Sequence, residues 1–270
     1  MKTAMKTRVM TALVLAAGML AVVLLLPPLA TVLVLTIGAL AGAWEWSAFL
    51  RATGKLARGA YVALIAALFV VAWQCTADRA VRDLVMSVAI AWWIIALGWI
   101  LFAPQRVAPW SAALAGIFAL VPAWLALMRL RLDMLNGAQW MLFVFILVWG
   151  ADMGALFFGG RYGRLRLAPA VSPGKTWEGV LGGMLLSSVV AVCGSFWFKV
   201  PLAFFLPLCL TGVAFSIVGD LTESLLKRFT GIKDSGSVFP GHGGVMDRID
   251  SVTGAAPVLL FGLAAFGVSP

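Results

Sequence analysis

The stretch from residue 233 to residue 250 gathers the kinds of side chain that bind phosphate groups and metal ions. It reads Lys-Asp-Ser-Gly-Ser-Val-Phe-Pro-Gly-His-Gly-Gly-Val-Met-Asp-Arg-Ile-Asp. Glycine lets backbone amides approach an anion closely and take positive φ, so the glycines around His242 favour an anion-binding loop. The basic side chains that could contact phosphate oxygens here are Lys227, Arg228, Lys233 and Arg248. The alternative, a polar turn followed by a capped helix, explains fewer of these residues.

Two carboxylates flank this loop. Asp220 ends a long apolar run, and Asp247 opens the last apolar segment, three residues before Asp250. Mg²⁺ takes carboxylate, water and phosphate oxygens, so Asp220 and Asp247 together could hold this ion. If the helix continues past Asp220, Glu223 and Lys227 share its face. An ion pair of Lys227 with Asp220 or Glu223 is the structural alternative.

A second polar cluster, Ser-Pro-Gly-Lys-Thr-Trp-Glu-Gly, occupies residues 172–179. Lys175 is placed to meet a phosphate at a helix N-terminus, where free amides and the helix dipole also favour anions. Glu178 would then be an acid of the first helical turn. Capping by Ser172 or Thr176 is the simpler alternative, and it explains the hydroxyls but not the lysine. The segment lacks the glycine spacing of a Walker A loop.

Two further acids lie inside apolar segments. Asp152 is flanked by small residues that permit close helix packing, so we expect it to face an interior cavity. A structural hydrogen bond is the alternative for Asp152. Glu45 lies between Trp44 and Trp46, and tryptophans so placed are typical of the membrane–water interface.

These residues must be positioned by helices that cross a membrane. The chain is 63% hydrophobic and only 11% charged, far from the composition of a soluble domain. We expect an all-α, polytopic membrane protein with about nine transmembrane helices in a single embedded domain, residues 1–270, whose catalytic region is about 138–270. The apolar segments are about 9–26, 29–49, 60–75, 84–103, 109–128, 138–159, 177–198, 202–221 and 251–268. Residues 1–30 also resemble a signal peptide, but we favour a retained first helix.

The distribution of charge predicts the orientation. With the N-terminus in the cytoplasm, 15 of the 20 basic residues fall on the cytoplasmic side, as the positive-inside rule requires. Segments 160–176 and 222–250 then lie together on that side. The net charge of +9 fits this topology and a polyanionic substrate, and we expect no nucleic-acid partner.

The stretch from Ser224 to Asp250 resembles the signature of the phosphatidate cytidylyltransferase family. In order it has Ser, one residue, an apolar residue, Lys-Arg, four residues, Lys-Asp, a variable stretch, Pro, one residue, His-Gly-Gly, an apolar residue, one residue, Asp-Arg, an apolar residue and Asp. Segment 172–179 matches a second family motif, and Asp152 lies in a third. Met153 and Leu156 depart from the Thr and Tyr that are usual in that third motif.

The resemblance implies a bacterial-type inner (plasma) membrane enzyme with its active site facing the cytoplasm, and a homodimer. It would join CTP to phosphatidic acid with Mg²⁺, making CDP-diacylglycerol and pyrophosphate. Implied catalytic residues are Asp220, Asp247, Lys227, Lys233 and His242, with Asp220 and Asp247 on the metal. Implied substrate contacts are Ser172, Lys175, Thr176, Glu178, Glu223, Ser224, Arg228, Asp234, Gly241, Gly243, Gly244, Arg248 and Asp152.

Two other functions are compatible with parts of the sequence. A CTP-dependent lipid kinase would share the nucleotide and the metal but release CDP. A transporter would use Asp152 and Glu45 to mark an ion path. The transporter is disfavoured because the polar residues concentrate in loops and the sequence shows no internal repeat.

Overall fold

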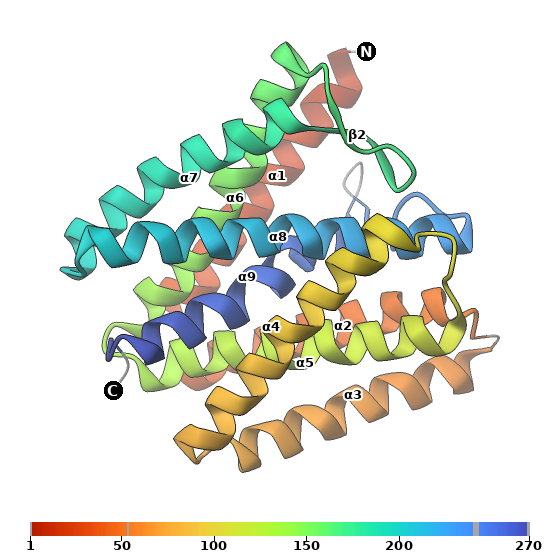
Figure 1. Ribbon diagram of the computed structural model, residues 1–270. Coiled ribbons are helices and arrows are strands. Elements are labelled where there is room, and N and C mark those ends of the chain that lie inside the picture. Colours follow the sequence, from red (N-terminus) through yellow and green to blue (C-terminus); the bar gives the residue numbers. More distant parts are fainter. Residues whose placement is uncertain (1, 53, 240–242, 269–270) are drawn as a thin grey trace.

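The computed structural model describes residues 2–52, 54–239 and 243–268, and in the first helix it describes side chains only at Thr11 and from Val14 onward. This part of the chain forms nine α-helices and one antiparallel hairpin (Figure 1). The helices are α1 (Lys2–Leu25), α2 (Pro28–Trp46), α3 (Lys55–Cys75), α4 (Arg79–Phe102), α5 (Pro109–Asp133), α6 (Gly137–Tyr162), α7 (Trp177–Phe198), α8 (Leu202–Thr230) and α9 (Met246–Ala265). A short 3-10 helix, η1 (Ser47–Leu50), follows α2, and the hairpin pairs β1 (Arg166–Ala168) with β2 (Ser172–Thr176).

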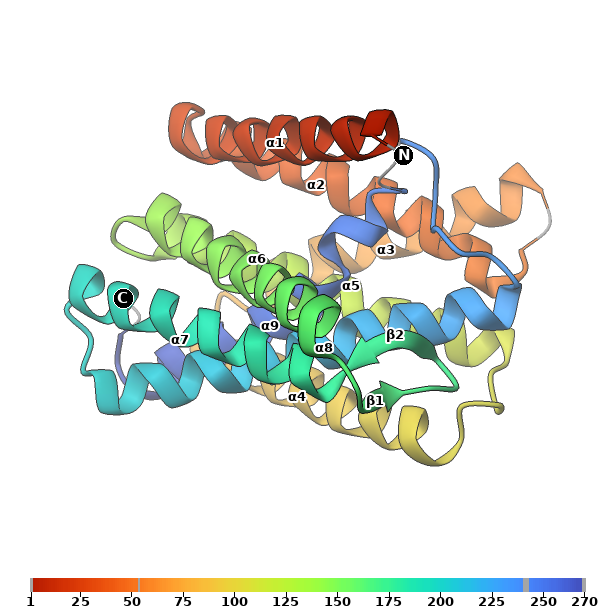
Figure 2. The same ribbon diagram turned by 90° about the horizontal axis from the view of Figure 1, so that it is seen from above.

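The connections between helices gather at two opposite ends of the bundle (Figures 1 and 2). The α2–α3 and α4–α5 turns, the hairpin and the polar loop after α8 lie at one end, called here the hairpin end. The α3–α4, α5–α6 and α7–α8 turns lie at the other. Segments 160–176 and 222–250, which the charge distribution predicted to share one side of the membrane, therefore lie at the same end of the bundle.

Eight helices in the described part of the chain, α2 to α9, are long and apolar enough to cross a bilayer. The described apolar part of α1 is Val14–Leu25. On α3 and α4 large apolar side chains such as Leu64, Val70 and Ile95 are exposed, as expected of surfaces that face lipid. The protein is an all-α, multi-pass membrane protein, as predicted.

Several helices extend beyond the apolar segments read from the sequence. The apolar run that was expected to end near residue 221 belongs to α8, which continues to Thr230. There Gly231 takes positive φ, and the Ile232 amide donates to the Lys227 carbonyl at 3.0 Å, which closes the helix. At the other side of the loop, α9 begins at Met246 instead of near residue 251. Hydropathy misses these turns because charged residues such as Lys227, Arg228, Asp247 and Arg248 lower the local average, although the backbone remains helical.

Glycines set the distance between the helices that carry the acids. A Cβ on Gly219 of α8 would lie 2.6 Å from the Asp250 carbonyl, and one on Gly254 of α9 would overlap the Phe215 carbonyl. Backbone contact this close places Asp220 directly opposite the first turns of α9. Helices α6 and α7 approach in the same way, because a Cβ on Gly154 would overlap the Gly182 carbonyl.

Trp44 and Trp46, on either side of Glu45, were predicted to lie at the membrane–water interface. The prediction is wrong for Trp46, which is buried in the protein. Its side chain is 1% exposed, and its Nε1 donates to the Ala112 carbonyl on α5 at 2.9 Å. Trp44 is partly exposed, and the Arg58 guanidinium lies 4.4 Å from its ring centroid. Spacing alone could not separate the two, because only the packing of α2 on α5 decides which indole is covered.

The α6–α7 contact yields a stability prediction. Gly154→Ala adds a methyl group where a backbone carbonyl already lies, so the apparent unfolding temperature of the detergent-purified protein should fall by about 2–10 °C. Gly98→Ala is the matched control, because nothing lies within 4 Å of a Cβ at that helical position. An equal effect of the two variants on the melting curve would contradict the close packing of α6 on α7.

Candidate active site

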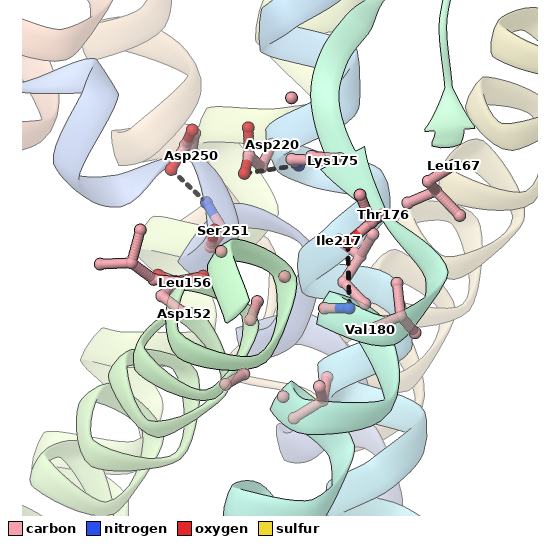
Figure 3. Close-up of a pocket in the computed structure, with 18 of the residues that line it drawn as sticks. Asp152, Leu156, Leu167, Lys175, Thr176, Val180, Ile217, Asp220, Asp250 and Ser251 are labelled. Carbon is pink, nitrogen blue, oxygen red and sulfur yellow. Dashed lines mark hydrogen bonds and ion pairs between the residues drawn. The ribbon is translucent and has the colours of Figure 1, made fainter. Parts of the chain in front are cut away.

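A cavity of about 630 Å³ lies between α6, β2, α7, α8 and α9 towards the hairpin end (Figure 3). It brings together eight of the predicted site residues, which are Asp152, Lys175, Thr176, Asp220, Lys227, Asp234, Asp247 and Arg248. Part of its lining is apolar and includes Leu156, Val180 and Ile217. The cavity therefore offers charged groups and an apolar wall to the same ligand.

The first charged pair of the cavity joins β2 to α8. Lys175 Nζ lies 2.5 Å from Asp220 Oδ2, and both side chains remain about a quarter exposed (Figure 3). Thr176 caps α7 by accepting a hydrogen bond from the Gly179 amide at 3.2 Å, as the structural alternative predicted. Because this capping fixes the end of β2, it holds Lys175 over the cavity.

Lys227 forms the second charged contact, between two carboxylates. Its Nζ lies 2.6 Å from Glu223 Oε2 and 2.8 Å from Asp247 Oδ1, and Glu223 is fully buried. The predicted common face of Asp220, Glu223 and Lys227 is present because α8 continues through them. The structural alternative, an ion pair of Lys227 with Asp220 or Glu223, is also confirmed, because Lys227 pairs with Glu223.

Asp247 holds the polar loop against the start of α9. Its Oδ2 accepts from the Gly244 amide at 2.7 Å and from both the amide and the hydroxyl of Ser235, at 2.9 and 2.8 Å. Gly243 has positive φ, as expected of a glycine-rich turn. Gly241 and His242 lie outside the described residues.

The cavity contains an excess of carboxylates. Asp250 lies beside Asp220, and Asp152 lies next to Ser251 on the same cavity (Figure 3). Only Asp220 of these three has a lysine partner there, so hard oxygen donors are available and the donor set suits Mg²⁺. Among the residues that the structure describes, no three acidic, histidine or cysteine side chains converge on one point. A bound ion would thus need phosphate oxygens and water as further ligands, which is the usual coordination of Mg²⁺.

Besides Glu223, Gly243 and Gly244, five predicted substrate or catalytic residues with described positions do not line the cavity. Arg228 Nε donates to the Val171 carbonyl at 3.3 Å, Ser224 Oγ lies 3.4 Å from Asp220 Oδ1, and Lys233 is exposed in the loop. Ser172 is a strand residue of β2. Glu178 faces a separate hollow beside Arg161 and Arg164, and both of its carboxylate oxygens lie 3.2 Å from the Leu165 amide.

Three residues of this region were missing from the predicted site. Asp250 lines the cavity, and its spacing of three residues from Asp247 was a visible signal. Ser235 contacts Asp247, and Glu45 reaches the same loop from α2. Glu45 had a signal too, because an acid within an apolar run usually has a function or a partner. Nothing in the sequence indicated which partner it would find.

The contacts of Lys227 give a second stability prediction. Lys227→Met leaves buried Glu223 without a counter-charge, so the protein should lose about 3–5 kcal/mol of stability and melt at a clearly lower temperature. Adding Glu223→Gln should restore part of this loss. Exposed Lys55 provides the control substitution Lys55→Met. A melting curve of Lys227→Met that matches the control would refute the pairing.

Comparison with known proteins agrees with this geometry. The profile of the Cytidylyltransferase family matches residues 6–266. A phosphatidate cytidylyltransferase of Haemophilus influenzae is 39% identical over 278 residues, covering 94% of this chain and 96% of its own length. A phosphatidate cytidylyltransferase of Pseudomonas aeruginosa is 40% identical over 235 residues, covering 84% of both chains. With a family match over nearly its whole length and these two relatives, the chain belongs to the cytidylyltransferase family, and it is a membrane-embedded nucleotidyltransferase.

Proposed function

We propose that this protein transfers the cytidylyl group of CTP to phosphatidic acid, releasing pyrophosphate and forming CDP-diacylglycerol. The observation that carries the proposal is the cavity itself, which places Lys175, Lys227 and Arg248 beside an apolar wall within the membrane-spanning bundle. A phospholipid needs both kinds of surface, since its phosphate is anionic and its chains stay in hydrocarbon. The names of the two relatives agree with this substrate pair.

In the reaction an oxygen of the lipid phosphate attacks the α-phosphorus of CTP, and the bond from that phosphorus to the bridging oxygen of the β-phosphate breaks. The leaving pyrophosphate takes the electron pair of this bond. No general base is required, because a phosphate monoester is already ionised near neutral pH. The protein's task is to hold two anions together, and Lys175, Lys227, Arg248 and Lys233 can neutralise them.

We assign the Mg²⁺ ligands to Asp220 and Asp247, with Asp152 and Asp250 as nearby carboxylates. The ion would neutralise phosphate charge in the transition state. Asp220 supports the assignment best, because among the described residues its Oδ1 has a single long contact, at 3.4 Å with the Ser224 hydroxyl. Asp247 already binds Lys227 and the loop, so it would also have to keep the loop in place.

The site should face the cytoplasm of a bacterial inner membrane. The relatives are bacterial, and the hairpin end carries most of the basic residues. The homodimer implied by the resemblance is part of the same proposal, and chemical cross-linking in native membranes would test it.

Two other functions have less support. A transporter would need Glu45 and Asp152 along an ion path, but Glu45 is 5% exposed and bound by three donors, and Asp152 faces the cavity. A CTP-dependent lipid kinase would use a similar cavity. It differs in its products, because it would release CDP and leave no cytidylyl group on the lipid.

The decisive assay supplies detergent-purified protein with CTP, Mg²⁺ and phosphatidic acid, measures pyrophosphate, and separates the lipid products. We expect pyrophosphate and a CDP-lipid only when all three are present. CDP together with a newly phosphorylated lipid would establish the kinase instead. Protein that is folded by its melting curve but forms neither product with several lipids and metals would refute both.

The same assay tests the carboxylates. Asp220→Asn should lower kcat about 100- to 1,000-fold, because it removes a charge that would hold the metal at the transferring phosphate. Asp83→Asn is the matched control, since Asp83 lies at the start of α4 beside Arg79 and Arg82. An Asp247→Asn variant with full activity and an unchanged Mg²⁺ dependence would remove Asp247 from the metal site.

A further inference from the structure

Glu45 is a buried carboxylate in the N-terminal half of the chain, and it contacts the polar loop between α8 and α9. It lies at the end of α2 and is 5% exposed. Its Oε1 accepts a hydrogen bond from the Val245 amide at 3.0 Å. Its Oε2 accepts from the Met246 amide at 2.8 Å and from the Ser235 hydroxyl at 3.0 Å. Three donors that are nearly 200 residues away in sequence thus converge on one side chain.

Two glycines of the loop make room for this carboxylate. A Cβ on Gly236 would overlap Glu45 Oε1, and a Cβ on Gly244 would overlap both carboxylate oxygens. The loop is therefore wrapped around Glu45, with backbone on two sides of it. The amides at the start of α9, where the helix dipole favours an anion, are bonded to Glu45 and Asp247. Among the described residues, the amides of Gly244, Val245 and Met246 are therefore already bonded to carboxylates, while Lys175, Lys227 and Arg248 line the cavity with cationic donors.

Ser235 links Glu45 to the site. Its Oγ lies 3.0 Å from Glu45 Oε2 and 2.8 Å from Asp247 Oδ2. A hydroxyl has one proton, so it donates to one of these carboxylates at a time. The backbone amide of Ser235 donates to Asp247 in addition, at 2.9 Å. Any displacement of the loop from Glu45 would therefore move a donor of Asp247, and Asp247 holds Lys227.

We infer that Glu45 is a positioning residue of the active site, which fixes the loop segments 235–236 and 244–246 and through them Asp247 and Arg248. Its catalytic consequence rests on the proposed cytidylyl transfer, whereas its effect on the loop does not. A residue that only stabilised the bundle would affect the melting temperature and not the loop in particular. All three hydrogen bonds between Glu45 and the loop end on its carboxylate oxygens, so its amide analogue separates the two roles.

The first experiment measures the loop without substrate. Glu45→Gln keeps the size of the side chain but replaces one acceptor oxygen with an amide nitrogen, which cannot accept these hydrogen bonds. Hydrogen exchange followed by mass spectrometry should then show the amides of Val245 and Met246 exchanging about tenfold faster or more. The melting temperature should stay within about 3 °C of the unaltered protein. Asp83→Asn, the same chemical change at the other end of the bundle, should leave both quantities unchanged.

The second experiment measures catalysis with CTP, Mg²⁺ and phosphatidic acid in mixed micelles. Glu45→Gln should lower kcat about 10- to 100-fold, the cost of a misplaced catalytic group, with KM for phosphatidic acid changed by less than about threefold. Glu45→Asp, which keeps the charge one methylene further from the loop, should recover part of both kcat and amide protection. Ser235→Ala should reproduce the loss of kcat without any change on α2.

Each result has a distinct meaning. Unaltered exchange at Val245 and Met246 in Glu45→Gln would overturn the inference, as would faster exchange with unaltered kcat. If Glu45→Gln fails to fold, the same two measurements on Ser235→Ala decide, and unaltered kcat there overturns the inference. If the unaltered protein forms no CDP-lipid, the proposed function fails, while the exchange experiment still reports whether Glu45 holds the loop.

Discussion

Charged groups within a membrane-spanning bundle are stable only when opposite charges and hydrogen-bond donors surround them, and this requirement organises the functional half of the molecule. Lys227 lies between Glu223 and Asp247, and Lys175 reaches Asp220 from the hairpin. The contacts of Lys175 with Asp220 and of Lys227 with Asp247 join different elements, whereas Lys227 and Glu223 lie one turn apart on α8. The electrostatic pairs that hold the charges are therefore also the contacts that assemble the cavity.

The charge pairs could not form without the close approach of the helices that carry them. Gly219 and Gly254 let α8 and α9 meet backbone to backbone, which places Asp220 and Asp250 on adjacent sides of one cavity. The close contact of α6 with α7 at Gly154 likewise places Asp152 at the wall of this cavity. Small residues thus determine the distances between acids on different helices, and those distances determine whether a cation and two phosphates can share the cavity.

Arginines at the opposite end of the bundle serve the fold. Arg129 is 8% exposed, donates to the Trp73 carbonyl at 3.0 Å and pairs with Asp133 at 3.2 Å, while its guanidinium lies 4.0 Å from the Trp73 ring centroid. Arg82 is equally buried and lies 3.9 Å from Asp133. The acid Asp133 thus neutralises two buried cations at this end of the bundle.

The amino-acid sequence by itself determined the class of the protein and most of the charged residues that line the candidate cavity. Long apolar runs require membrane helices, and the polar residues 172–179 and 224–250 between them are denser in charge and glycine than a helix cap or a connecting turn needs. From those facts the family, the shared side of the two segments and the eight predicted residues of the cavity were predictable. Tertiary structure alone decided the partners of these residues: Lys175 with Asp220, Lys227 with Glu223 and Asp247, and Glu45 with the loop. The reason is physical. Hydropathy and spacing describe one helix against its solvent, whereas a buried charge is satisfied by whichever distant group the packing of other helices brings within hydrogen-bond distance.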